Sequence, residues 1–212
     1  RAKENIVKTD HVKIFIISFF WMALPFFMFG IAEKTIASSL AGLINGSTPI
    51  FVAFIAVVIY KLKVTKIQVL YIFTGFIGVG LISLSEGIND ISIEIGFIYA
   101  LIASISYAIA VNMVEPLIQK YDSLIVIKMV LRYAFLISFI IFGPTASFKL
   151  PTVEVSLIPM LILGIGGTGI AFLTYYKLLE SVGRISSSFV VYMIPIFSIF
   201  FGYQFLDEIT NS

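Results

Sequence analysis

The sequence predicts an all-α membrane protein, a polytopic bundle of seven transmembrane helices. Hydrophobic residues make up 59% of its 212 residues, charged residues only 12%, and the mean hydropathy is +1.07. Soluble domains carry roughly 25% charged residues, so this chain has too few charges to give a soluble domain its polar surface. Seven apolar stretches are each long enough for a helix to cross a bilayer core of about 30 Å.

Short polar segments separate these apolar stretches and contain helix-end signals. The spans are expected at Ile14–Ala32, Thr35–Tyr60, Ile67–Ser85, Ile95–Val114, Leu124–Phe142, Val155–Tyr176 and Ile185–Leu206. Thr65 and Gln68 have the spacing of a capping box, and Asp122 with Ser123 is a common helix start. The connections are short, which leaves no room for a soluble domain.

The basic residues divide unequally between the two sides of the membrane. If the chain changes sides at every span, 12 of its 14 Lys and Arg residues fall on the side of the amino-terminal tail. Only Lys34 and Lys149 fall on the opposite side. Because short cytoplasmic loops are enriched in Lys and Arg, residues 1–13 are expected to be cytoplasmic, in a multi-pass protein of the cell (plasma or inner) membrane.

The composition excludes several kinds of site. Cysteine is absent and His11 is the single histidine, which excludes disulfides, thiolate metal sites and cysteine nucleophiles. The sequence contains neither H-E-x-x-H nor G-x-S-x-G. Gly164–Gly169 reads G-x-G-x-x-G, but a dinucleotide site needs a preceding strand, and this segment lies inside an apolar span. We therefore expect no enzymatic activity, no metal and no cofactor.

The net charge of +2 gives no indication of nucleic-acid binding. The expected partners are the lipid bilayer and a small-molecule substrate. The sequence leaves the oligomeric state open, and a homodimer is compatible with it.

The second and seventh spans contain similar sequences. The tripeptide Pro-Ile-Phe at 49–51 returns at 195–197. At the same offset, the further matched pairs are Ala37 with Gly183, Ala41 with Ser187, Gly42 with Ser188, Phe54 with Phe200, and Ala56 with Gly202. Chance recurrence of proline and phenylalanine in apolar sequence is the alternative explanation.

If this repeat is real, its two copies have opposite orientations. The matching spans are five helices apart, and an odd number of crossings makes the copies enter the membrane from opposite sides. Inverted repeats of this kind occur in secondary transporters, with the substrate site near the midplane. Residues 1–90 are then the last three helices of one five-helix repeat and residues 91–212 the first four of another. Two helices are expected before Arg1 and one after Ser212.

The repeated pattern resembles the EamA-like transporters of the drug/metabolite transporter superfamily. Small residues are followed by Pro-Ile-Phe and then by an apolar run that ends near a charged pair. Ala37–Thr65 is similar to the family's fourth helix and the loop after it, and Arg184–Thr210 to its ninth. Asp207 and Glu208 stand where the family often has an acidic residue, and Arg132 matches an arginine common near the start of its seventh helix.

The resemblance implies a 5+5 inverted-repeat permease or exporter with ten helices and both ends cytoplasmic. This chain would cover the third to the ninth of those helices. The first repeat reads Tyr-Lys-Leu-Lys at 60–63, where the second has its acidic pair, and departs from it there. The motifs are diffuse and do not identify a substrate.

Two prolines mark a candidate substrate cavity. Pro49 and Pro195 lie inside their spans, where each removes an amide donor and disrupts the preceding turn. Asn45 and Thr48 lie about a turn from the first proline, and Tyr192 about a turn from the second. Polar groups at both breaks favour a hinge or cavity wall, and a packing kink is the alternative.

Asn112 is the most polar member of a small-residue face on the fourth span. Ala100, Ser104 and Ala108 precede it at every fourth position, a spacing that lets helices approach closely. An asparagine is costly in lipid, so Asn112 is expected to face the interior and to bond a neighbour or the substrate. Arg132 either extends to the lipid headgroups or forms a cationic patch at the cavity mouth.

Aromatic residues complete the candidate cavity. Trp21 lies in mid-span, away from the interface where membrane tryptophans usually lie. It belongs either to core packing or to an aromatic cavity wall, as do Tyr107 and Tyr175. The predicted cavity residues are Trp21, Asn45, Thr48, Pro49, Tyr107, Asn112, Arg132, Tyr175, Tyr192 and Pro195.

The leading functional hypothesis is a secondary transporter that moves a small metabolite, an amino acid or a drug by alternating access. A non-transporting membrane scaffold or assembly subunit is the main alternative, and it requires a packed bundle without a polar cavity. An intramembrane enzyme is the less favoured alternative because the catalytic motifs are missing.

Overall fold

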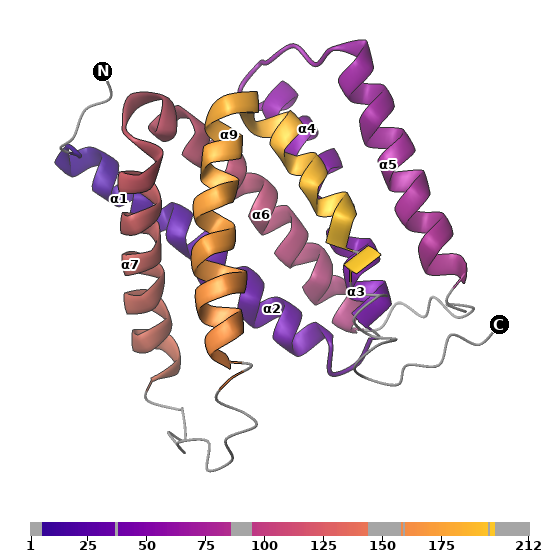
Figure 1. Cartoon of the computed structure of the whole chain (residues 1–212), viewed down its shortest axis with the longest axis horizontal. Helices are drawn as coiled ribbons and strands as arrows, with labels where there is room; N and C mark the ends of the chain where they lie inside the picture. Colours follow the sequence, from indigo (N-terminus) through magenta and orange to yellow (C-terminus); the bar gives the residue numbers. More distant parts are fainter. Residues whose placement is uncertain are drawn as a thin grey trace. The chain divides into compact units, whose positions relative to one another are not determined.

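Every regular element in the described part of the chain is a helix. The computed structural model describes residues 6–36, 38–85, 95–143, 158, 160–194 and 196–197. The elements are α1 (Lys8–Ser18), η1 (Phe19–Ala23), α2 (Leu24–Ala32), α3 (Ser38–Asn45), α4 (Thr48–Val58), α5 (Lys66–Ser85), α6 (Ile95–Lys120), α7 (Ser123–Phe142), η2 (Ile162–Ile170), α9 (Ala171–Ser188) and η3 (Phe189–Met193) (Figure 1). Segments η1 and η2 are π-helical, and η3 is a 3₁₀ helix. The predicted all-α fold is confirmed for these residues.

Five helices of the described part are long and apolar enough to cross a membrane. They are Lys8–Ala32, Leu40–Val58, Ile95–Lys120, Ser123–Ile141 and Ile162–Met193. The described apolar helix Lys66–Gly78 is shorter. The protein is thus an integral multi-pass membrane protein, while the predicted count of seven spans is not confirmed.

Two predicted helix starts have the expected hydrogen bonds. The backbone amide of Thr65 donates to Gln68 Oε1 at 3.0 Å, and the Gln68 amide donates to Thr65 Oγ1 at 3.3 Å. This reciprocal pair is a capping box. At the start of α7, Asp122 Oδ1 accepts a 2.8 Å hydrogen bond from the Leu124 amide. Local polar spacing therefore located both helix starts.

Helix α6 is longer than the sequence predicted. The fourth span was expected to end at Val114, but α6 continues through Pro116 to Lys120. A proline removes one backbone donor, and membrane helices tolerate this loss because neighbouring groups satisfy the freed carbonyl. The six added residues carry α6 to its junction with α7.

The predicted second span is divided in two. Helix α3 ends at Asn45, α4 begins at Thr48, and Pro49 lies in the first turn of α4 rather than within a continuous helix. Proline is well tolerated at a helix start because the amide it lacks would have no helical partner there. The break between α3 and α4 lies within the apolar stretch Leu40–Val58.

A turn at Gly183 divides α9. Gly183 has φ 79° and ψ 172°, a backbone conformation open essentially to glycine alone. Residues before and after this point form separate helical segments. The turn lies in the gap that the sequence predicted between the spans ending at Tyr176 and beginning at Ile185.

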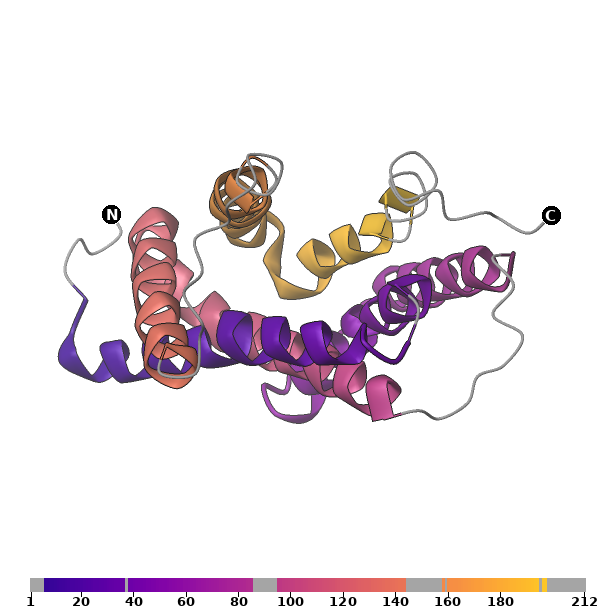
Figure 2. The same cartoon turned by 90° about the horizontal axis from the view of Figure 1, so that it is seen from below.

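The chain forms two compact units. Unit 1 comprises residues 1–19 and 113–183, and unit 2 comprises residues 20–112 and 184–212. In unit 1, α1 contacts α7, and the two helices cross each other (Figure 1 and Figure 2). Ile14 and Ile17 of α1 and Val126, Ile127 and Val130 of α7 are fully buried.

In unit 2, the end of α2, helix α3 and the start of α6 share an apolar cluster. Its buried members are Ala32, Ile36, Leu40, Ala41, Ile44 and Ala100. A Cβ at Gly96 would lie 2.8 Å from the carbonyl oxygen of Ala32, so glycine lets α6 approach the end of α2 closely. Segment η3 contacts both α4 and α5. Helix α4 and η3 run in opposite directions (Figure 1).

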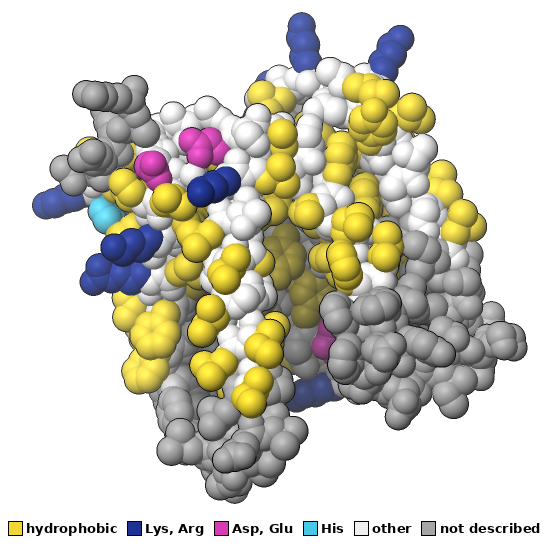
Figure 3. All heavy atoms as spheres, in the orientation of Figure 1, with side chains coloured by type: hydrophobic (Ala, Val, Ile, Leu, Met, Phe, Trp, Pro, Cys, Tyr) yellow, Lys and Arg dark blue, Asp and Glu magenta, His cyan; other side chains and the backbone are white. Residues whose placement is uncertain are grey.

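Large hydrophobic side chains cover the sides of the described helices. Phe135, Phe139 and Ile140 on α7 and Ile162 and Leu163 on η2 are exposed. On the face drawn in Figure 3, hydrophobic side chains are spread over the described helices. Exposed apolar side chains are expected on helices whose sides contact lipid.

We expect Gly183→Ala to lower the free energy of unfolding by about 1–3 kcal/mol, because alanine is strained at this backbone conformation. The added Cβ would also lie 3.2 Å from Glu115 Oε1. Gly78→Ala is the matched control, since Gly78 is helical and a Cβ there meets no atom within 4 Å. Unfolding in detergent should show a loss for the first variant alone. Equal stability of the two variants would contradict the assigned turn.

Candidate functional site

A polar seam runs through unit 2 along the contact between α6 and the broken α3–α4 segment. We define the seam as Asn45, Thr48, Ser104, Asn112 and Arg184. Ser104 and Asn112 come from α6, Asn45 and Thr48 flank the helix break, and Arg184 follows the turn at Gly183. Three of the predicted cavity residues, Asn45, Thr48 and Asn112, therefore lie in it.

Two side chains of α6 bond backbone carbonyls of the opposite segment. Ser104 Oγ lies 3.1 Å from the Ile44 carbonyl oxygen and 3.0 Å from that of Ala100, and its single proton is shared between them. Asn112 Nδ2 donates to the Val52 carbonyl at 3.1 Å and to the Ala108 carbonyl at 2.9 Å. The small-residue face of α6 thus packs closely enough to reach the backbone beside it.

The helix break concentrates polar groups inside an apolar span. Ser47 donates to the Ile44 carbonyl through its amide at 3.0 Å and through its hydroxyl at 2.6 Å. Thr48 Oγ1 donates to Asn45 Oδ1 at 3.2 Å. Pro49 has no amide proton, so the Asn45 carbonyl lacks the donor that a continuous helix would supply. In lipid, such a break is tolerated only where protein or a water-filled cavity covers it.

Arg184 is a buried cation in this seam. Its side chain is 6% exposed, and its Nη1 donates to Asn112 Oδ1 at 3.2 Å. The guanidinium carbon lies 4.5 Å from the centroid of the Tyr60 ring, within cation–π range. The sequence placed Arg184 among the loop cations, whereas the structure buries it directly after the Gly183 turn. A buried arginine is expensive without such partners.

Asn112 is fully engaged with the protein. Its two amide protons go to two carbonyls, and its Oδ1 accepts from Arg184. The side chain is 0% exposed. Asn112 therefore holds α4, α6 and the segment after Gly183 together in this conformation, and a contact with substrate stays a prediction.

Tyr192 packs against α5. Its hydroxyl donates to the Ile72 carbonyl at 2.8 Å, and its ring is stacked with Phe189 at 6.2 Å between centroids. A Cβ at Gly75 would overlap the Tyr192 ring, so the missing side chain makes this contact possible. Pro195, predicted to form the second break, lies outside the described residues.

The other predicted residues divide between the two units. Trp21 is buried in η1, and half-buried Tyr107 stacks on Phe29 at 6.2 Å, both in unit 2. Tyr175 is half-buried and Arg132 is exposed, both in unit 1. Among the described side chains, no group of three His, Cys, Asp or Glu residues could hold a metal ion.

The parts of the seam that depend on tertiary contact were not predicted from the sequence. The sequence predicted a packing role for Ser104, a loop position for Arg184 and the end of the second span for Tyr60. The available signal was Gly183 immediately before Arg184, because a glycine turn can bring a charged residue back toward the bundle. Gly75 carried no signal of its own, since its role depends on Tyr192.

We expect Asn112→Ala to lower the free energy of unfolding by about 1–3 kcal/mol, because it leaves buried polar groups without their partner. Thr74→Ala is the control, since Thr74 is exposed and bonds its own helix at Leu70 O, 2.9 Å away. Chemical unfolding in detergent compares the two variants. A loss no larger for Asn112→Ala than for Thr74→Ala would show that the seam does not stabilise unit 2.

Comparison with family models assigns the chain to a known group. The model of the EamA-like transporter family matches residues 2–84 and 94–212. A comparison with curated proteins gives no match. The match covers nearly the whole chain and agrees with the resemblance seen in its repeated sequence. The division into repeats at residue 90 stays a prediction.

Proposed function

The chain belongs to the EamA-like transporter family, and we propose that it is a secondary transporter that moves a small metabolite, an amino acid or a drug by alternating access. Membership indicates a transporter of the drug/metabolite type, and we propose that the protein has no enzymatic activity. Alternating access and the substrate class go beyond family membership and are proposals.

The broken helix between Asn45 and Thr48 is the observation that carries this proposal. Discontinuous helices near the midplane form the substrate sites of many secondary transporters, because their freed backbone groups are available for binding. Here the break is followed by Pro49 and faces the polar side chain of Ser104. The α3–α4 break is therefore both a hinge and one wall of the proposed site.

The direction of the chain in unit 2 also supports an inverted repeat. Helix α4 contains the first Pro-Ile-Phe tripeptide, and η3 leads into the second. These two segments contact each other and run in opposite directions (Figure 1). In transporters built from inverted repeats, exchange of the conformations of the two halves moves the opening from one side of the membrane to the other.

The proposed topology follows from the charge distribution. Residues 1–13 are placed in the cytoplasm because 12 of 14 Lys and Arg residues fall on the side of the tail when the chain crosses at each of the seven predicted spans. We further propose that the protein lies in the plasma or inner membrane. Its partners are the bilayer and the transported molecule, and the proposal holds for a monomer or a homodimer.

Flux of radiolabelled metabolites, amino acids and drugs into proteoliposomes tests transport by the full-length protein. Pro49→Ala should lower the maximal rate on the order of tenfold, a barrier change of about 1.4 kcal/mol. The reason is that proline is about 3 kcal/mol less favourable than alanine in a helix interior, so its removal favours one continuous, stiffer helix.

Pro116→Ala is the matched control for the hinge. Pro116 is exposed within the unbroken helix α6, so its loss should leave the rate unchanged. Equal maximal transport rates of the two variants would contradict a hinge at the α3–α4 break. Absence of flux for every compound, from protein that remains folded, would contradict transport itself.

Introduced cysteines separate a transporter from a packed scaffold. The native chain has no cysteine, so a single thiol at Asn45, Asn112 or Tyr192 reports on its own site. We expect a membrane-impermeant thiol reagent to reach position 45 or 192 in part of the population, because a transporter opens its site to water. A scaffold would leave all three positions unlabelled.

A further inference from the structure

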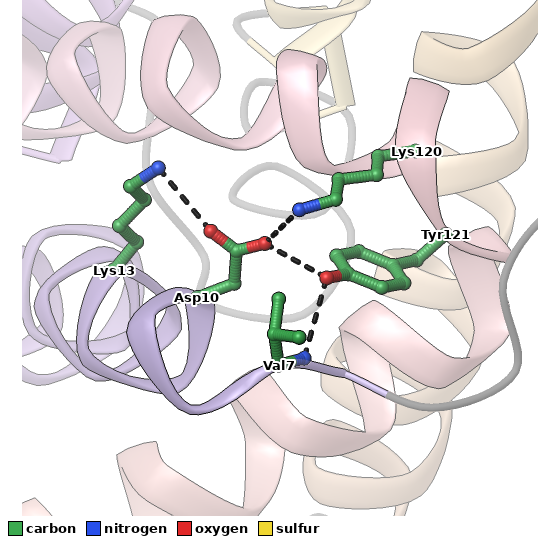
Figure 4. Close-up of polar contacts among 5 residues, drawn as sticks. All are labelled: Val7, Asp10, Lys13, Lys120 and Tyr121. Carbon is green, nitrogen blue, oxygen red and sulfur yellow. Dashed lines mark hydrogen bonds and ion pairs between the residues drawn. The ribbon is translucent and has the colours of Figure 1, made fainter.

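A buried carboxylate joins the start of α1 to the end of α6 in unit 1. Asp10 lies in the first turn of α1 and is 3% exposed. Its Oδ2 accepts from Lys120 Nζ at 2.5 Å and from the Tyr121 hydroxyl at 2.8 Å, and its Oδ1 pairs with Lys13 Nζ at 3.2 Å (Figure 4). One acidic side chain thus connects residues far apart in the chain.

Tyr121 extends the connection to the backbone of the tail. Its side chain is fully buried, and its hydroxyl donates to Asp10 while it accepts from the Val7 amide at 3.3 Å (Figure 4). One turn after Val7, His11 Nδ1 and the Tyr133 hydroxyl lie 2.8 Å apart. The beginning of α1 is therefore bonded to the α6–α7 junction and to α7.

The chemistry of this cluster suits a contact that breaks and reforms. Asp10 is buried, but its two ammonium partners keep access to water, with Lys120 42% and Lys13 62% exposed. An ion pair buried at both ends resists separation, because either charge would be left without a partner in an apolar environment. Here the two lysine ammonium groups can be hydrated after separation. Only the Asp10 carboxylate is then left without its charged partners.

The bonded residues belong to different predicted repeats. Asp10 lies in residues 1–90, and Lys120, Tyr121 and Tyr133 lie in residues 91–212. When two repeats exchange conformations, bonds between them at one end of the membrane must open and close. Lys13 and Lys120 both pair with Asp10, and the attraction of two cations strengthens the closed contact.

We propose that Asp10, Lys120 and Tyr121 form a latch that holds the start of α1 against the α6–α7 junction in one state and releases it in the other. The assignment of these states to a transport cycle rests on the proposed function. The latch itself is a conformational equilibrium that can be measured without any substrate.

Thiol labelling at Ile14 measures this equilibrium. Ile14 lies one turn after Asp10 and is 0% exposed, so Ile14→Cys reacts only when α1 moves away. We expect Asp10→Asn to raise the labelling rate about tenfold or more, because a hydrogen bond to a charged group shifts an equilibrium by that factor. Lys120→Gln should act in the same direction and add little to Asp10→Asn, since both remove the same ion pair.

Three controls distinguish a latch from general loosening. Val12 is 61% exposed, so Val12→Cys should be labelled at the same rate with and without the latch substitutions. Asp122→Asn removes an exposed acid and keeps a helix cap, so it should not change labelling at position 14. Val52→Cys reports on a fully buried site of unit 2 and should stay slow.

Unchanged labelling at position 14 in Asp10→Asn would overturn the latch, as would equal acceleration at position 52. If Asp10→Asn does not accumulate in membranes, labelling in Lys120→Gln tests the latch instead. The Lys120 side chain is partly exposed, so its replacement is compatible with folding. Faster labelling at position 14 in a protein without measurable flux would support the latch and contradict only the proposed transport. Normal flux with unchanged labelling at position 14 would contradict only the latch.

Discussion

Hydrocarbon supplies no hydrogen bonds, so every backbone amide and carbonyl inside the membrane must find its partner within the protein. This constraint explains why the described spans are helical, and it makes the break between Asn45 and Thr48 informative. The break is supported by hydroxyl groups of Ser47 and Ser104 at the Ile44 carbonyl. An irregular segment that needs such support inside an apolar span points to function, since a continuous helix would satisfy the backbone without it.

Charges follow the same rule at a higher cost. Arg184 is buried with Asn112 and the Tyr60 ring, and Asp10 is buried with lysines and a tyrosine hydroxyl. Each cluster joins segments that are far apart in sequence, so each fixes an arrangement that apolar packing alone would leave less specific. The two clusters differ in their access to water: the cations around Asp10 are partly exposed, whereas Arg184 is buried. Only the Asp10 cluster therefore suits a contact that opens.

Local signals in the sequence predicted local structure well. Hydropathy gave the helical class, the Thr65 and Gln68 pair gave a capping box, and Asp122 gave the start of α7. Pro49 predicted a break in the second span. The position of Pro49 in the first turn of a new helix depends on the hydrogen bonds of Ser47. The burial of Arg184 and Asp10 could not be predicted, because their partners come from distant segments. A charged residue at a span end has the same local sequence whether it is exposed or folded back into the bundle.

The account depends most on water reaching the α3–α4 break in a folded, membrane-embedded protein. Hydrogen–deuterium exchange of the full-length protein in lipid nanodiscs measures this directly. The account predicts faster exchange of the backbone amides at 46–51 than of those at 52–58 in α4, because only the break borders a site that opens to water. Equal, strong protection of both segments would mean that the break is sealed by packing, and the transport mechanism proposed for it would be wrong.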